Sequence, residues 1–381
     1  MFLRIFNTIV LVLFIGCTSA SQYNIYADAT GTVLIPQKNN SFNNTAKFLA
    51  GLPVENEAIN PYIDEKFYPK YSDAINKSWN ESFEPNRKSI SKWRSENLQS
   101  NYGLSVFYPF SGPDIIHPLT FYPKAREIVM FGLEPTGGIP NVENVNTTEI
   151  NQHLKLLLDA INFTLEKAFF ITLEMSTNVK HSSLNGTSAI MFFFLARGGY
   201  DILNITEISL AEDGNVTDGI STDKNAINGV EILFTDKGSR DVKRVRYFTL
   251  DVANYSKQLD KFSIYVRKHP PFNSIIKSAS YLMSLNNFSK IRNLILDVSS
   301  SIIQDDSGVP YNYFKNNNNW AVTHFGRYHK PIPVFAGNYQ KELDEDNKHK
   351  SVAPIPFVYG YGYGYKDITY HLLLAEKVKK D

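Results

Sequence analysis

Two short apolar runs, "LSVFYPF" (residues 104–110) and "REIVMFGLE" (residues 126–134), decide the expected fold. Each run has the length of a strand, is apolar at almost every position and closes near glycine and proline. Strands that are buried on both faces have this pattern, which is typical of the centre of a sheet covered by helices. We therefore expect an α/β fold, a mixed sheet covered by helices, with α+β as the alternative.

The segments that follow alternate between helical and extended patterns. Asn146 and Glu149 resemble a capping box at the start of a long amphipathic helix. A second, apolar helix in "SAIMFFFLARGGYDI" ends at two glycines. Further patterns predict a short helix at 114–123, a hairpin at 229–252, helices at 273–283 and 288–304, and strands at 320–328 and 368–378.

The N-terminus has the pattern of a secretory signal. Arg4 precedes the apolar run "IFNTIVLVLFIG", which is too short to require a membrane span. Cys17, the single cysteine of the chain, follows this run directly, as in bacterial lipoprotein signals. We expect lipid modification of Cys17, with cleavage after Ala20 as the alternative. The prediction is an exported lipoprotein of the outer membrane or periplasm, held on a membrane surface by its acyl chains, or otherwise a soluble secreted protein.

Composition divides the chain into a signal peptide (1–20), a polar, Asn-rich leader with short helices (21–100) and a single α/β domain (101–381). The leader is expected to be peripheral. Many N-x-S/T sequons occur, including one at Asn43 and one at Asn162. Asn162 falls near the apolar stripe of a predicted helix, which favours a chain rich in asparagine over a glycoprotein.

Composition also excludes several classes of function. The chain is 43% hydrophobic and 20% charged, with a formal net charge of +1, so it lacks the clustered basic charge of a nucleic-acid-binding protein. It has no H-E-x-x-H, cysteine cluster, P-loop or complete G-x-G-x-x-G motif. We therefore expect no metal, no nucleotide cofactor and no nucleic-acid partner.

The turn "SGPDIIH" carries the main candidate site, because it places Ser111, Asp114 and His117 just after a predicted strand. Open α/β sheets bind ligands at this carboxyl edge. The favoured interpretation is a capped turn, with Ser111 or Asp114 as the cap and Pro113 in the first turn of the helix. The alternative is catalytic: Ser111 as nucleophile, His117 or a distant histidine as base, and Asp114 or Glu134 orienting it.

Three further candidates are weaker. Glu134, also at a strand end, and Arg197 in the apolar helix are expected to form a structural ion pair. Asp305 and Asp306 are expected in a solvated turn rather than a cation site, because other spaced ligands are missing. An extended "YGYGYGY" segment aligns three tyrosines, which either bind a flat or sugar-like partner or, as we favour, pack on the protein itself: Tyr361, Tyr363 and Tyr365.

Several unusual segments, in this order, resemble a family of uncharacterised secreted bacterial proteins: "YPFSGPD", "GLEPTGGIP", "FFFLARGGYDIL", "IIKSASYLM", "FSKIRNLIL", "IQDDSGVPYNYF" and "FGRYHKPIPVF". The resemblance covers residue 101 to the C-terminus and departs in the Asn-rich leader and the Tyr-Gly repeat. It implies a bacterial, exported protein with one integrated domain, and it implies no activity.

Two functions follow from these patterns. The first is a lipid-anchored protein of the cell envelope that binds a protein or polysaccharide partner without turnover. The second is an exported serine-type hydrolase that acts through the turn at 111–117. The sequence favours the first, because it contains no complete catalytic motif.

Overall fold

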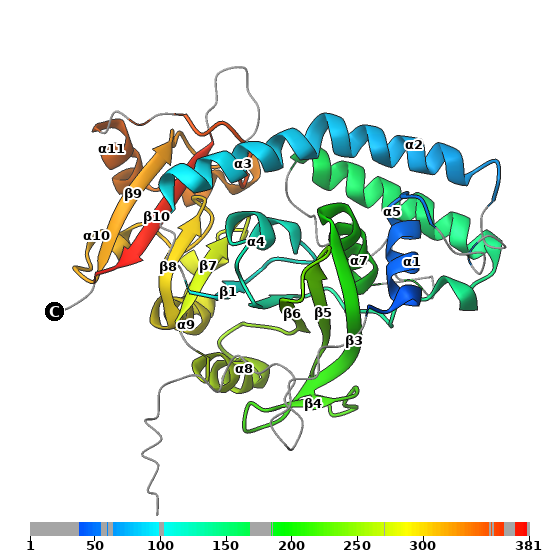
Figure 1. Ribbon diagram of the computed structural model, residues 1–381. Coiled ribbons are helices and arrows are strands. Elements are labelled where there is room, and N and C mark those ends of the chain that lie inside the picture. Colours follow the sequence, from blue (N-terminus) through cyan, green and yellow to red (C-terminus); the bar gives the residue numbers. More distant parts are fainter. Residues whose placement is uncertain are drawn as a thin grey trace, which may run out of the picture. The chain divides into compact units, whose positions relative to one another are not determined.

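The two apolar runs form adjacent parallel strands at the centre of one sheet (Figure 1). They are β1 (Ser105–Tyr108) and β2 (Glu127–Gly132), and Val106 lies opposite Ile128. The computed structural model describes residues 38–54, 59, 64–98, 103–167, 184, 186–269, 271–349, 352, 354–361 and 370–378. Both strands are buried along nearly their whole length, as the sequence predicts.

The described strands form one ten-stranded mixed sheet in the order β4-β3-β5-β6-β2-β1-β7-β8-β10-β9. The five central strands, β6 to β8 in this order, are parallel, and the strands that flank them on both sides pair antiparallel. Their bounds are β3 Tyr200–Leu210, β4 Val216–Asp218, β5 Ile227–Asp236, β6 Val242–Thr249, β7 Phe272–Ile276, β8 Ser299–Gln304, β9 Trp320–Gly326 and β10 His371–Lys377. The expected α/β class is confirmed.

Helices cover both faces of the sheet. The core on one face includes residues from six helices: α1 (Asn40–Leu49), α2 (Tyr68–Ser78), α3 (Glu84–Asn97), α4 (Ile116–Phe121), α5 (Thr147–Lys167) and α7 (Thr187–Gly198). The other face packs against α8 (Lys257–Arg267), α9 (Ser289–Val298), α10 (Asn312–Lys315) and α11 (Lys341–His349). Because successive strand residues point to opposite faces, Val106 and Tyr108 enter the first core while Phe107 enters the second.

Short irregular helices complete these layers. A π-helical turn, η3 (Trp79–Phe83), joins α2 to α3, and four 3₁₀ turns lie elsewhere: η4 Val142–Asn144, η5 Leu282–Ser284, η6 Asn286–Phe288 and η7 Pro333–Asn338. In the part of the chain that the structure describes, no helix combines the length and the apolar character needed to cross a bilayer.

Most local patterns give the expected elements, and two do not. The Asn146 side chain accepts a hydrogen bond from the backbone N–H of Glu149 at the start of α5, and β5 and β6 form the expected hairpin. The helix expected at 273–283 is wrong, because this segment forms β7, a loop and the start of the short turn η5. The helix expected at 288–304 is half wrong, since α9 ends at Val298 and β8 follows at once. Strand pairing at the centre of the sheet overrides the local pattern in both segments.

The expected leader contributes to the main core. Phe48 in α1, Ile75 in α2 and Trp93 in α3 are all buried in the core on the first face of the sheet. All described residues belong to one compact unit, Gln37–Asp381, so the composition change near residue 100 does not mark its edge. Asn43, which carries one of the sequons, is buried, and its side chain bonds the backbone of Ile202, as expected for a structural rather than a glycosylated asparagine.

The order of the parallel strands creates a crevice at the carboxyl edge of β1. The chain runs from β1 through α4 to β2 on one side, and after β6 it crosses to β7 on the other side of β1. The connections that follow β1 and β7 therefore diverge. In open α/β sheets such a switch point is the usual place for a ligand.

Candidate functional site

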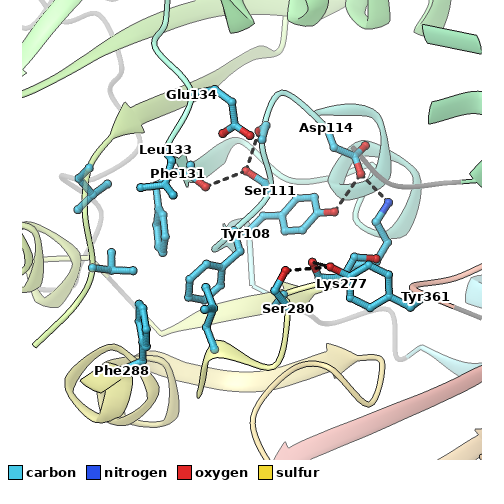
Figure 2. A pocket seen from close by; sticks show the side chains of 18 of the residues that line it. Tyr108, Ser111, Asp114, Phe131, Leu133, Glu134, Lys277, Ser280, Phe288 and Tyr361 are labelled. Atoms are coloured by element: carbon cyan, nitrogen blue, oxygen red, sulfur yellow. Dashed lines mark hydrogen bonds and ion pairs between the residues drawn. The ribbon is translucent and has the colours of Figure 1, made fainter. Parts of the chain in front are cut away.

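A cavity of about 640 Å³ lies at this switch point, between the loops that follow β1, β2 and β7. Figure 2 shows that polar side chains gather on one side of it. The polar lining includes Tyr108, Ser111, Asp114, Glu134, Lys277 and Ser280, and the apolar lining includes Phe110, Phe131, Leu133, Leu250, Leu282, Phe288, Val334 and Phe335. Its volume and mostly apolar walls are those of a small-molecule site.

The backbone around the cavity is held in an unusual conformation. All four non-glycine residues with positive φ in the described chain lie in the loops after β1 and β7: Phe110 (57°), Ser278 (54°), Ser280 (52°) and Tyr281 (55°). An L-residue pays for this left-handed conformation in free energy, and such residues persist where the surroundings fix them, most often at binding and active sites. The concentration of all four in two loops singles out this edge of the sheet.

A buried polar network joins the two loops. The Lys277 ammonium donates to Asp114 Oδ2 at 2.7 Å, and the Tyr108 hydroxyl donates to the same oxygen at 2.9 Å (Figure 2). On the other side of the carboxylate, His117 Nδ1 lies 2.7 Å from Asp114 Oδ1. Asp114 and Lys277 are 2% and 3% exposed. We call the ion pair between Asp114 and Lys277, together with the contacts of Tyr108 and His117 to Asp114, the strut. It connects residues that are far apart in the sequence.

The charges of the strut balance each other. Burial disfavours ionisation of Asp114, but His117 and Lys277 outweigh it and hold the pKa of this carboxyl below its ordinary value. Burial lowers the pKa of Lys277 and of His117, and Asp114 opposes both shifts. Lys277 Nζ lies 3.2 Å from Nδ1 and 3.4 Å from Nε2 of His117. With Nδ1–H donating to Asp114, Nε2 is the ring nitrogen that can accept from the ammonium, which fits a neutral imidazole.

Ser111 lines the cavity but is not joined to a base. Its hydroxyl oxygen lies 2.8 Å from the carbonyl oxygen of Gly112 and 3.4 Å from that of Phe131, and it donates to these acceptors. The hydrogen bonds of His117 go to Asp114 and Lys277, so within the described residues Ser111 and His117 do not form a nucleophile–base pair. Nor does Ser111 cap α4, which begins at Ile116, beyond Pro113; of the two expected caps, Asp114 alone accepts a backbone N–H of this first turn, from His117 at 3.4 Å.

Glu134 lies just beyond the end of β2 and shares the polar side of the cavity with Ser111 (Figure 2). Its carboxyl oxygen Oε2 accepts a hydrogen bond from the Tyr247 hydroxyl at 3.2 Å. Gly132 makes room for it, because a Cβ there would lie 2.3 Å from Oε2. The expected ion pair with Arg197 is wrong: the Arg197 guanidinium bonds Asn76 and lies over the ring of Trp79.

The acidic turn after β8 is buried rather than solvated, which corrects the expectation for Asp305. Its carboxylate accepts hydrogen bonds from Ser307 and from the backbone N–H groups of Ser278 and Tyr361. Asp306 accepts from the Tyr281 hydroxyl, and burial together with Asp305 raises its pKa to about 7. Among the described residues, no group of three or more histidine, cysteine, aspartate or glutamate side chains is placed to hold a metal ion.

Of the remaining candidate residues from the sequence, one lines the cavity and three lie outside the described residues. Tyr361 lines the cavity, and its hydroxyl donates to the Ser278 carbonyl at 2.9 Å, so it packs on the protein. Tyr363, Tyr365 and Cys17 lie outside the described residues.

Sequence reasoning missed Lys277 and the serines beside it, because the segment "NSIIKSASYLM" was interpreted as a helix. Its first half, with two isoleucines after "NS", also fits a short buried strand. Interpreted in this way, Lys277 and Ser278 stand at a strand end, the same position that singled out Ser111 and Asp114. If every short apolar run is treated as a possible strand, and the residues after it as candidate site residues, Lys277 and Ser278 are found as well.

Comparison with known proteins adds no assignment: no family model, no curated protein and no solved structure matches this chain.

Proposed function

We propose that this protein binds a small organic molecule in the cavity at the carboxyl edge of β1, β2 and β7. The observation that carries the proposal is the coincidence of this cavity with the topological switch point and with all four left-handed non-glycine residues of the described chain. A volume of about 640 Å³ lies within the usual range for sites that enclose a small ligand.

The lining indicates an amphipathic ligand. Phenylalanine, leucine and valine side chains supply most of the wall, and the polar groups converge on one side. Two apolar residues of the lining, Leu133 and Val334, are 64% and 76% exposed. Exposed apolar side chains beside a concave site are typical of a rim that a ligand covers. The ligand is expected to place its apolar body between the phenylalanines and its polar group near Ser111 and Glu134.

The strut supports binding by holding the cavity in shape. Asp114 and Lys277 tie the loop after β1 to the loop after β7, and each charge has its partner. A site whose walls are already fixed binds without the cost of ordering them. This assigns the strut a positioning role and leaves Ser111, Glu134 and Ser280 as polar groups for contact with a ligand.

A serine-type hydrolase is the second candidate, and the observation that favours it is the position of Ser111 in the cavity wall. Ligand binding is favoured over hydrolysis because the Ser111 hydroxyl bonds two carbonyl oxygens, while His117 is engaged by Asp114. Export, with an acyl anchor on Cys17 at the envelope, belongs to the same proposal and rests on the signal-like N-terminus.

The test is binding of an uncharged fluorescent dye, Nile red, to the mature chain, followed by displacement with a fragment library. Leu133→Glu and Val334→Glu place a charge at the apolar rim and are expected to weaken dye binding about tenfold or more, while both variants keep the wild-type melting temperature. Ile220→Glu is the matched control, since Ile220 is 46% exposed and lies outside the cavity.

Saturable binding that both rim variants weaken and the control does not supports the proposal. The proposal fails if neither the dye nor any fragment binds, or if the three variants weaken binding equally. The same protein, assayed with ester, amide and phosphoester substrates, tests the second candidate. Activity that is lost in Ser111→Ala supports hydrolysis, and unchanged activity rejects Ser111 as its nucleophile.

A further inference from the structure

One acid in the cavity wall has no counter-charge. Glu134 is 5% exposed, and its side chain accepts a single hydrogen bond, from Tyr247 to Oε2. Oε1 has no hydrogen-bond partner among the described residues, and no lysine, arginine or histidine of the described chain pairs with the carboxyl group. A buried carboxylate ordinarily has a paired charge or several donors. The carboxyl group of Glu134 is therefore arranged to receive a donor from the cavity.

We infer that the ligand carries a protonated amine and that Glu134 binds it. This inference rests on the proposed function and gives the chemical class of its ligand. The amine would donate to Oε1 of Glu134, and the apolar body would extend toward the phenylalanines of the cavity. A charge-assisted hydrogen bond of this kind is about twice as strong as one between neutral groups.

The charge of the lining supports a cation. Among the charged side chains of the described lining, three are acids, Asp114, Glu134 and Asp251, and one is a base, Lys277. Lys277 neutralises Asp114, which leaves the lining with an excess of negative charge. A concave site with one sign of charge and apolar walls focuses the potential, so it attracts a cation and repels an anion.

Two backbone carbonyl oxygens beside Ser111 add hydrogen-bond acceptors to the side of the cavity that Glu134 shares, although the Tyr247 and Thr249 hydroxyls there are donors to Glu134. The carbonyl oxygens of Gly112 and Phe131 lie beside the Ser111 hydroxyl, which has a single proton to donate, and the Phe131 oxygen also accepts the backbone N–H of Ser111 at 3.1 Å. The rings of Phe110 and Phe131, whose centroids are 5.1 Å apart, add aromatic surface that suits a cation. A carboxylate ligand at this position would be repelled by the Glu134 carboxylate and by these carbonyl oxygens.

The lining contains another acid, Asp251, which differs from Glu134 in its hydrogen bonds and its burial. Asp251 Oδ1 accepts the backbone N–H of Ala253 at 2.9 Å, so this carboxylate already stabilises its own loop. The two acids contribute the same charge to the cavity, but Glu134 is the more deeply buried. Substitution of each acid by its amide therefore separates direct contact from the general electrostatic field.

The test uses three probes with the same apolar body: phenylbutylamine, phenylbutanol and phenylbutyrate. Their dissociation constants are measured on the mature chain at neutral pH, by displacement of Nile red and by calorimetry. The amine is expected to bind at least tenfold more tightly than the alcohol, and the carboxylate most weakly. Glu134→Gln is expected to weaken the amine by about tenfold to a hundredfold and the alcohol by less than about threefold.

Asp251→Asn is the matched control and is expected to weaken the amine by less than about threefold. Glu134→Asp, which shortens the side chain and keeps its charge, is expected to fall between Glu134→Gln and the wild type, and it replaces Glu134→Gln if that variant does not fold. Melting temperatures and Nile red affinity establish that each variant retains the cavity.

The inference is overturned if the alcohol or the carboxylate binds as tightly as the amine, or if Glu134→Gln and Asp251→Asn weaken the amine equally. It is also overturned if Nile red binds in the cavity and none of the three probes displaces it. In that case the proposed function stands with a ligand of another class. Failure of the dye and of the whole fragment library instead rejects the proposed function itself.

Discussion

Two ionic clusters of the same sheet differ in what surrounds them. Arg244 and Arg246 of β6 pair with Glu127 of β2 and Glu231 of β5 on neighbouring strands, where all four side chains are 13–16% exposed. The strut between Asp114 and Lys277 joins residues 163 positions apart, at 2% exposure on both sides.

The two clusters differ in how they respond to the loss of one charge, because they differ in solvent exposure. The cluster on β2, β5 and β6 keeps contact with water, so an arginine that loses one partner keeps a second carboxylate and some hydration. Loss of one partner from the strut leaves the other charge without water, at the point where two loops meet. The first cluster tolerates a missing charge, whereas the second does not.

The largest expected effect comes from breaking the strut. Asp114→Asn keeps the shape of the side chain and leaves Lys277 as a buried cation, which is expected to lower the free energy of unfolding by about 3–5 kcal/mol. Urea unfolding followed by circular dichroism measures this change. The double variant Asp114→Asn, Lys277→Met removes both charges and is expected to recover part of the loss. A single variant that loses less than about 1 kcal/mol contradicts the role given to the strut.

A second test uses Asp305 and Asp306 after β8, at the same edge of the sheet. The charge of Asp305 acts on Lys277, but among the described residues neither acid forms a salt bridge. Burial and the neighbouring Asp305 raise the pKa of Asp306 to about 7, whereas the unfolded chain releases this proton near pH ~4. Between these values the folded state holds more protons, so this group makes the fold less stable as pH rises through the window. The effect of Asp306 is expected to be smaller than that of Asp114→Asn.

Asp306→Asn is expected to remove this slope. Buried histidines act in the opposite direction at acidic pH, since burial lowers the pKa of His117 and brings that of His371 to about 3. The informative quantity is therefore the difference in unfolding free energy between variant and wild type at each pH. A difference that stays constant from about pH 4 to 7 contradicts the raised pKa of Asp306.

Local signals predicted the part of the site that lies next to them. The apolar runs around β1 and β2 placed Ser111, Asp114 and Glu134 at one edge of the sheet, because strand length and burial are visible in a few residues. The cap at Asn146 and the hairpin of β5 and β6 were visible for the same reason.

Long-range partners were not predictable in this way. Asp114 finds Lys277 only after β7 has been inserted beside β1, and no local pattern encodes that pairing. Asp305 looked like a solvated turn because its donors, the N–H groups of Ser278 and Tyr361, come from two distant loops. Both errors have the same cause. Whether a charged side chain becomes buried depends on segments that are distant from it in the sequence.

Loss of a carboxylate from the partly exposed cluster is expected to change stability least. Glu231→Gln removes one carboxylate from the cluster on β2, β5 and β6, and Arg246 keeps Glu127 and the Tyr265 hydroxyl as partners. Because the cluster is partly hydrated and has a second acid, the loss in unfolding free energy is expected to be about 1 kcal/mol. The same urea experiment at low and high salt measures it, and added salt should shrink the difference. If Glu231→Gln and Asp114→Asn instead lowered the free energy of unfolding equally, the difference in solvent exposure would not explain how the two clusters respond to a missing charge. The stabilising role given to the strut at the cavity would then be wrong.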